Sequence, residues 1–348
     1  MRRHPSAWAV LAVSLVVVSG CGGKAEVADK TVASTTTSAP PVEPGPATPG
    51  TGAPLTGLAV TDRGALGRPA LMVKVDNAPL GRPQVGISEA DVVVEEGVEG
   101  GITRFAAIFH SVLPEAVGPV RSARTTDIFI ASALNRPLFA WSGANPDFAD
   151  LVRGAPLVDL GVDAKGSAYY RDRGRRSPYN LFVNPAELYD GAQGGPPEPM
   201  FSYKAPGQPA GGEPTTGVAM QWKANLTTRV EWRWDGASAS WLRTQDGSPH
   251  VDSGGGRISA TNVVVQIVEY RDTGYIDQSR TPVPEAELIG DGEAFLFAEG
   301  KVVSGRWRKL APDARTEYTD ATGAPFRLTA GRTWLELPAP GLVAISPG

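Results

Sequence analysis

The chain has 348 residues, 41% of them hydrophobic and 20% charged, which allows two ordinary domains with a sizeable core. Its formal net charge of −4 and the lack of a basic stretch argue against binding to duplex nucleic acid. A single cysteine excludes an internal disulfide, and three scattered histidines argue against a zinc site built on several histidines. Abundant glycine (41 residues) and proline (31 residues) favour β structure with many turns.

The N-terminus has the pattern of a bacterial lipoprotein signal peptide, which we place at residues 1–21. Arg2 and Arg3 precede an apolar stretch that is too short to cross a membrane as a helix. The stretch ends in Val-Ser-Gly-Cys at residues 18–21, and small residues before a cysteine resemble the lipobox, at which acyl chains such as palmitate are attached. We predict that Cys21 is acylated and anchors the protein in membrane lipid at the extracytoplasmic face of the cell membrane. An ordinary secretory signal with an incidental cysteine is the alternative.

Composition divides the rest of the chain into four segments. Residues 22–56 are rich in Thr, Pro and Gly and have few large apolar residues, which predicts a disordered tether. Residues 57–190 predict an N-terminal mixed α/β sandwich domain, and the Gly-Pro steps of residues 191–217 predict a linker. Residues 218–348 predict a small, mostly antiparallel β domain, so the fold class that we expect is α+β.

Apolar runs and turn residues place the individual elements. In the N-terminal domain we expect strands at residues 69–76, 92–94, 102–109 and 138–141, and helices at residues 124–135, 147–152 and 185–189. In the C-terminal domain we expect strands at residues 230–234, 239–243, 263–268, 293–297, 301–303, 306–308 and 332–337. Six tryptophans fall in this second domain, and we assign most of them to its core and one or two to an exposed face.

Arginines, a glycine pair and small hydroxyl residues bracket one expected strand between Glu99 and Arg124. Loops of this kind on a rigid sheet are typical of anion sites, because helix N-termini attract anions and guanidinium groups bind phosphate or carboxylate with two hydrogen bonds. We expect a polar cleft at one edge of the sheet. The predicted ligand-binding residues are Arg82, Arg104, Arg121, Arg124, Asp76, Asn77, Asp91 and Glu99.

The same residues allow other interpretations. Ion pairs between Arg and Glu could fix the loops without any ligand. The acids could hold a divalent cation, but no spacing matches a dedicated metal loop, so we predict no cofactor and no metal site. His110 ends an apolar strand and is interpreted as a packing residue. A second basic and aromatic patch at residues 169–180 is either a ligand contact or a solvated loop.

Five short motifs occur in a characteristic order. They are Val-Asp-Asn-x-Pro (residues 75–79), Arg-Pro-Gln (82–84), Ala-Asp (90–91), Glu-Gly-Gly-Ile-Thr-Arg (99–104) and Gly-Pro-Val-Arg-Ser-Ala-Arg (118–124). In this order they resemble the YerB-like family of bacterial lipoproteins. The resemblance implies a lipoprotein with an N-terminal and a C-terminal domain, and it assigns no catalytic residues.

These observations predict an accessory protein of the cell envelope that binds an anionic ligand, such as a wall fragment or a lipid-linked glycan. The first alternative is an enzyme, a cell-wall phosphotransferase or hydrolase that uses a divalent metal. The second alternative is a protein-interaction module of an envelope complex, with the tryptophan-rich domain as its docking face. The sequence identifies neither a catalytic residue nor a protein partner.

Overall fold

The computed structural model describes residues 52–348, apart from residues 61, 145, 223–227 and 278–279, and gives only the backbone of residues 63, 146 and 147. The described residues belong to one compact unit. The predicted signal peptide with Cys21, and the predicted tether up to residue 51, lie outside the described residues.

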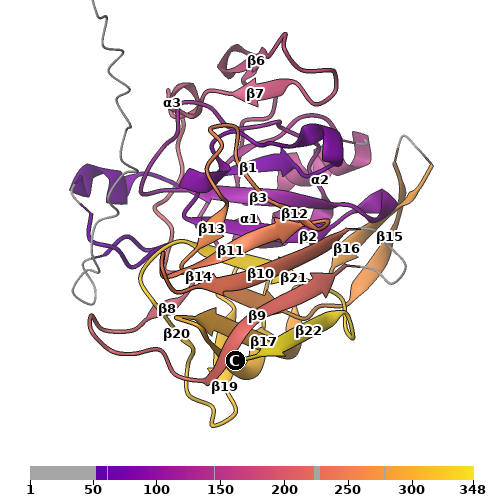
Figure 1. Cartoon of the computed structure of the whole chain (residues 1–348). Helices are drawn as coiled ribbons and strands as arrows, with labels where there is room; N and C mark the ends of the chain where they lie inside the picture. Colours follow the sequence, from indigo (N-terminus) through magenta and orange to yellow (C-terminus); the bar gives the residue numbers. More distant parts are fainter. Residues whose placement is uncertain (1–51, 61, 145, 223–227, 278–279) are drawn as a thin grey trace, which may run out of the picture. The chain divides into compact units, whose positions relative to one another are not determined.

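The described residues form many strands and few helices (Figure 1). The helices are α1 (Thr125–Ser132), α2 (Pro146–Gly154) and α3 (Pro185–Leu188). The first strands are β1 (Leu71–Asp76), β2 (Val92–Gly97), β3 (Thr103–Phe109), β4 (Leu138–Ala140), β5 (Val158–Asp159), β6 (Tyr169–Arg171) and β7 (Leu181–Val183). They are followed by β8 (Ser202–Tyr203), β9 (Glu213–Gln221), β10 (Arg229–Asp235), β11 (Ser240–Gln245), β12 (Ser248–Pro249), β13 (Ser259–Ala260), β14 (Asn262–Gln266), β15 (Tyr270–Ile276), β16 (Pro282–Ala286), β17 (Gly290–Ala298), β18 (Lys301–Lys309), β19 (Glu317–Asp320), β20 (Arg327–Leu328), β21 (Thr333–Leu337) and β22 (Val343–Pro347).

One sheet joins the two halves of the chain (Figure 1). Its central order is β17-β14-β21-β2-β3-β1-β4, so that β21, near the end of the chain, lies between β14 and β2. Strand β21 pairs in parallel with both neighbours, while β3 pairs antiparallel with both β1 and β2. The carboxyl ends of β1 and β2 and the amino end of β3 therefore lie at the same edge of the sheet.

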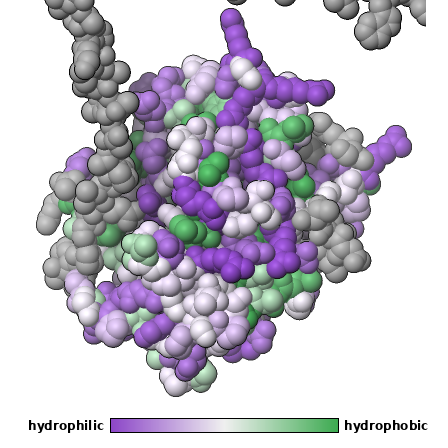
Figure 2. Space-filling model, in the orientation of Figure 1, coloured by the Kyte–Doolittle hydropathy of each residue, from purple (hydrophilic) through white to green (hydrophobic). Residues whose placement is uncertain are grey.

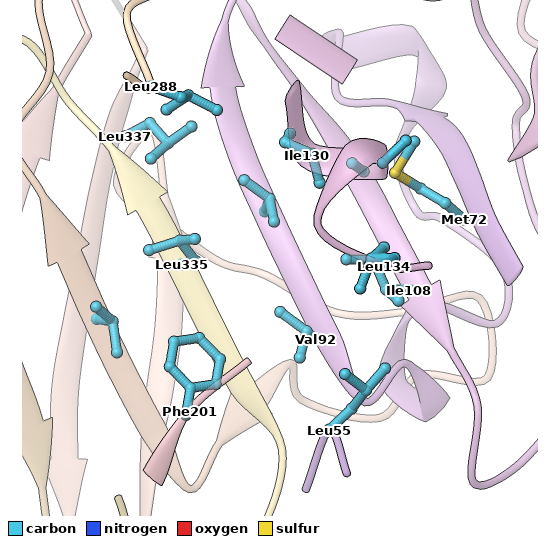
Figure 3. Close-up of a cluster of buried hydrophobic side chains, with 14 of the residues drawn as sticks. Leu55, Met72, Val92, Ile108, Ile130, Leu134, Phe201, Leu288, Leu335 and Leu337 are labelled. Atoms are coloured by element: carbon cyan, nitrogen blue, oxygen red, sulfur yellow. The ribbon is translucent and has the colours of Figure 1, made fainter. Parts of the chain in front are cut away.

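The central strands are buried on both faces because their side chains alternate between two hydrophobic clusters. Val92 and Val94 of β2 belong to one cluster and Val93 to the other. Figure 3 shows part of the first cluster, in which Val92 and Ile108 of the sheet lie with Ile130 of α1 and with Leu134, which follows α1. A continuous run of β-branched residues therefore forms a strand here, as expected from the sequence.

The predicted mixture of helices and strands is confirmed in part, since strands dominate among the described residues. The folded region begins before the predicted boundary at residue 57, because Ala53 and Leu55 are buried. The predicted linker, residues 191–217, packs on the rest of the unit and contributes β8, the start of β9 and the buried Phe201. Burying its apolar side chains in the core is more favourable than leaving them exposed to water in a solvated linker.

The tryptophans belong mainly to the interior. Five of the six that we assigned to the second domain are buried, namely Trp222, Trp232, Trp241, Trp307 and Trp334. Trp232 and Trp241 are fully buried and pack edge-on or tilted against other aromatic rings. The assignment of most of the tryptophans to the core is therefore confirmed for these five residues.

Candidate functional site

The polar residues near Glu99 collect at the sheet edge where β1 and β2 end and β3 begins. After β2 the chain turns through a short 3₁₀ segment, Glu99–Gly101, before it enters β3. Gly100 and Gly101 have φ angles of 71° and 72°, in the left-handed region that residues with a Cβ rarely adopt. This turn folds Glu99 back over the edge of the sheet, beside Arg104 at the start of β3.

Glu99 holds two arginines. Nε of Arg124 donates to Oε2 of Glu99 at 2.8 Å, and Nη2 of Arg124 contacts Oε1. Nη2 of Arg104 donates to the same Oε1 at 3.1 Å. All three side chains are less than 10% exposed, so water screens their charges only weakly. The arrangement is a buried carboxylate between two guanidinium groups.

The local charges shift two pKa values. Burial alone would raise the pKa of Glu99, but the hydrogen bonds of Arg124 and the charges of Arg104 and Arg124 outweigh it and lower that pKa to about 2. Burial and the neighbouring charge of Arg124 lower the pKa of Arg104 to about 10. Both groups therefore remain charged at neutral pH, and the cluster keeps one excess positive charge.

Arg121 is fixed from two sides. Its Nε lies 2.8 Å from Oδ2 of Asp76, a fully buried carboxylate at the end of β1. Its guanidinium carbon lies 5.7 Å from the centre of the Tyr179 ring. Among the described residues none accepts a hydrogen bond from the terminal nitrogens of Arg121. The guanidinium group of Arg121 is therefore fixed in position, while its terminal nitrogens can still donate hydrogen bonds to a ligand.

The segment from Val117 to Arg121 connects this edge to the β6–β7 hairpin. The backbone N–H of Val120 donates to the carbonyl of Leu181 in β7 at 2.7 Å, and that of Arg121 donates to the carbonyl of Lys74 in β1 at 2.9 Å. Gly118 makes the approach possible, since a Cβ there would lie 2.6 Å from the Phe182 ring. The hairpin and the arginine segment are therefore held side by side.

These elements surround a cavity of about 650 Å³, which we call the arginine cavity. Its charged lining consists of Arg104, Arg121, Arg124, Arg171, Glu99 and Asp277. Three serines, Ser122, Ser142 and Ser177, and apolar residues from α2, β7 and the β15–β16 hairpin complete the wall. In Figure 2 the face of the molecule is hydrophilic at the end that carries β6 and β7.

A buried triad of charged residues, Lys74, Glu96 and Asp127, fixes the segment that ends at Arg124. Nζ of Lys74 donates to Oδ1 of Asp127 at 2.8 Å and also contacts Glu96. The other carboxylate oxygen of Asp127 accepts the backbone N–H of Arg124 at 2.7 Å, which caps the first turn of α1. Burial raises the pKa of Glu96, although Lys74 opposes the shift. The position of Arg124 is thus set by groups inside the core.

The structure brings six predicted residues to this edge and leaves two elsewhere. Glu99, Arg104, Arg121 and Arg124 line the cavity, and Asp76 holds Arg121 from behind. Asn77 is buried and donates to Oγ1 of Thr103 at 2.7 Å.

Arg82 and Asp91 take no part in the cavity. Arg82 pairs with Asp246 at 2.9 Å and lines a different pocket of about 210 Å³. Asp91 is buried and accepts the backbone N–H of Ser111 at 2.7 Å, and burial raises its pKa. The side chain of Arg82 does not join the other predicted residues, because Asp246 from a distant hairpin holds it.

The acids are not arranged as cation ligands. Within the described ranges no three His, Cys, Asp or Glu side chains come together in a way that could hold a metal ion. Asp76 and Glu99 face arginines, and Asp91 accepts hydrogen bonds from the backbone and from Ser111. His110 is also outside the cavity: it is fully buried, and burial lowers its pKa to about 4.

Sequence reasoning separated groups that the structure joins. Arg171 was placed in a second patch, but it lines the arginine cavity. Ile276, Asp277 and Val283 were not singled out at all. They belong to the β15–β16 hairpin, and no local motif marks a residue that reaches a site from so far along the chain.

A second polar cluster inside the sheet was also missed. Arg243 is fully buried and contacts Glu95 of β2 at 2.5 Å, between the rings of Phe105 and Trp334. Nδ1 of His250 accepts from Arg243 at 2.6 Å. Burial holds the pKa of His250 well below its usual value, so the ring is neutral. The available signal was the alternation of β11, which places Arg243 on the same face as the apolar Trp241.

Comparison with known proteins identifies relatives of both halves. A family model described as "Protein of unknown function (DUF3048) N-terminal domain" matches residues 55–197, and the model of the corresponding C-terminal domain matches residues 218–335. "Putative lipoprotein YerB" of Bacillus subtilis is 30% identical over 288 residues, which cover 80% of this chain and 83% of that protein. A crystal structure of YerB from Bacillus subtilis matches with a TM-score of 0.74 at 26% identity and covers 85% of this chain and 99% of that chain.

Proposed function

The chain belongs to the DUF3048 family, and from this premise we propose that it is a lipid-anchored protein of the cell envelope that binds an anionic ligand in its arginine cavity. The family membership confirms the resemblance to YerB-like proteins that the sequence predicted. A relative that is itself described as a lipoprotein supports the proposed anchor at Cys21. No helix among the described residues is long and apolar enough to span a bilayer.

The observation that carries the proposal is an excess of positive charge around a cavity of about 650 Å³. Four arginines line it against two acids, and one of these acids, Glu99, is shared by Arg104 and Arg124. An anion in the cavity would offset this excess positive charge.

The geometry suits the binding of an anion. Arg121 and Arg171 are anchored by Asp76 and Asn180, so their donors are fixed before a ligand arrives. A preorganised guanidinium fork binds an oxyanion with two parallel hydrogen bonds. Anchoring at Cys21 would keep this cavity close to the membrane surface, where phosphate and carboxylate groups of lipids and glycans are abundant.

Calorimetric titration tests the proposal. Methyl phosphate and acetate are titrated into the full chain at low and at high salt, and into variants of the β6–β7 hairpin. Arg171→Ala removes a guanidinium from the cavity, and it should weaken anion binding roughly tenfold or more. Arg173→Ala removes an exposed arginine of the same hairpin that does not line the cavity, and it should leave binding unchanged.

Two results would contradict the proposal. One is that neither anion binds the parent chain at low salt. The other is that Arg171→Ala and Arg173→Ala weaken binding equally, because the effect would then come from general surface charge. Equal melting temperatures of the two variants show that the loss does not reflect unfolding.

A further inference from the structure

The four arginines of the cavity divide into two functional pairs. Arg104 and Arg124 are each about 5% exposed and are held by Glu99, so most of their donors already have acceptors. Arg121 is 23% exposed and Arg171 is exposed. Arg171 donates to Asn180 through Nη1 alone, at 2.9 Å, which leaves its Nε and Nη2 without an acceptor among the described residues. The donors that remain for a ligand therefore come from Arg121 and Arg171.

These donors come from different directions. Arg121 lies in the segment before α1, whereas Arg171 ends β6. A phosphate group has three or more oxygens in a tetrahedral arrangement and can accept from several elements at once. A carboxylate has only two oxygens, which lie in one plane with its carbon, so it accepts from fewer directions. The spread of the donors therefore favours phosphate.

The cavity is larger and more apolar than a phosphate ion needs. Its volume of about 650 Å³ falls in the range that accommodates a drug-sized organic ligand. Phe148 of α2, Val162, Leu181 of β7 and Ile276 and Val283 of the β15–β16 hairpin line the rest of the wall. Ile276 is 55% exposed and is part of this apolar wall.

We infer that the ligand of the arginine cavity is a phosphate ester that carries an apolar chain, with its phosphate on Arg121 and Arg171 and its chain against Phe148 and Ile276. This inference rests on the proposed function, because it names the class of anion that the cavity takes. A lipid phosphate and a small soluble phosphate ester share the head group, and the apolar wall favours the lipid. Arg104, Arg124 and Glu99 then form a brace behind the phosphate.

A series of alkyl phosphates tests this inference. Methyl, butyl and hexyl phosphate are titrated into the full chain, held in a neutral sugar detergent at a constant concentration. Burial of each methylene on the apolar wall should lower the dissociation constant roughly two- to fourfold. Hexyl phosphate should therefore bind much more tightly than methyl phosphate, while the neutral hexyl glucoside should not compete.

Two variants assign the effect to the wall. Ile276→Ser should flatten the dependence of affinity on chain length, so that it weakens the binding of hexyl phosphate much more than the binding of methyl phosphate. Leu310→Ser serves as the matched control, because Leu310 is also an exposed leucine-sized residue, 67% exposed, and it does not line the cavity. It should leave the whole series unchanged.

The outcomes separate this inference from the proposed function. Equal dissociation constants for methyl and hexyl phosphate would overturn the inference, while the binding itself would still support an anion site. Equal effects of Ile276→Ser and Leu310→Ser would also overturn it, because the chain would then bind elsewhere. Failure of all three phosphates to bind the parent chain would overturn both proposals together.

Discussion

Arg124 grips both oxygens of Glu99, with its Nε 2.8 Å from Oε2 and its Nη2 against Oε1. The two residues come from opposite ends of the motif region, one in the turn after β2 and the other at the N-terminal cap of α1. A two-point pair of this kind fixes orientation as well as distance. It therefore sets the position of the loop that presents Arg121 to the cavity.

Glu99→Gln should destabilise the protein, because it leaves Arg104 and Arg124 without a buried counter-charge. Breaking one partner of a buried pair costs roughly 2–4 kcal/mol, measured as the free energy of unfolding in urea at pH 7. Glu317→Gln, at an exposed position of β19, is the control and should change this value by less than about 0.5 kcal/mol. Equal stability of both variants would mean that Glu99 has no bracing role.

The same pair predicts a loss of stability in acid. The pKa of Glu99 is lowered from 4.5 to about 2 in the folded protein, so its contribution is present above pH 4.5 and disappears as the pH falls towards 2. The difference in unfolding free energy between the parent and Glu99→Gln should therefore shrink over this interval. A difference that stays constant from pH 5 to pH 2.5 would contradict the assignment.

Glu336 should show the opposite pH dependence to Glu99, because its contribution to stability is lost as the pH rises. Glu336 of β21 lies beside Glu95 of β2 in register, and burial, followed by the charge of Glu95, raises its pKa well above 4.5. Stability contributed by the protonated form is complete below pH 4.5 and is lost as the pH rises through the folded pKa. The Glu336→Gln variant keeps the acceptor for Nε1 of Trp232, which lies 2.7 Å from Oε1 of Glu336.

Unfolding free energies at pH 5 and pH 8.5 check this prediction. Glu336→Gln should match the parent at pH 5 and exceed it at pH 8.5. A variant that is less stable than the parent at both values would show that the ionised carboxylate is required between β2 and β21.

Gly118→Ala should separate the β6–β7 hairpin from the arginine segment. The added Cβ would lie 2.6 Å from the Phe182 ring and 2.9 Å from the carbonyl oxygen of Leu181, so one of these elements must move. Such overpacking costs about 1–3 kcal/mol in the free energy of unfolding. Gly154→Ala meets no atom within 4 Å and should be neutral or slightly stabilising. Equal thermal stability of the two variants would count against the close approach.

Cys21→Ala should abolish lipid attachment. Cells that express the parent chain should incorporate a clickable palmitate analogue into it, because the acyl groups are attached through the lipobox cysteine. The variant has no other cysteine that could take up an acyl chain. Labelling of the variant at the level of the parent would contradict the predicted anchor.

Local sequence patterns predicted the strands and helices around the site, because the formation of each of these elements depends on residues that are close in sequence. The β-branched run of Val92, Val93 and Val94 forms β2, and helical spacing after Arg124 forms α1. The prediction of two strands at residues 301–303 and 306–308 differs from the single β18, whose Ser304 and Gly305 continue the pairing with β17. Ser304 and Gly305, which are common in turns, did not interrupt the hydrogen bonding between β17 and β18, because both strands are long and regular.

Long-range pairing was beyond the reach of the sequence patterns. No local signal indicates that β21 inserts beside β2, so the division into two halves concealed a shared sheet. The arginine cluster was predicted from composition, yet its partner Arg171 and the apolar Ile276 come from hairpins far along the chain. The candidate site was therefore predicted on its charged side and missed on its apolar side.

Crystals of the protein grown with hexyl phosphate give the most direct test of the central claim, the binding of an anion in the arginine cavity. The account predicts phosphate density within hydrogen-bond distance of Arg121 and Arg171, with Glu99 still bound to Arg124. Density for the phosphate at another place on the surface, with the arginine cavity containing only water, would contradict it.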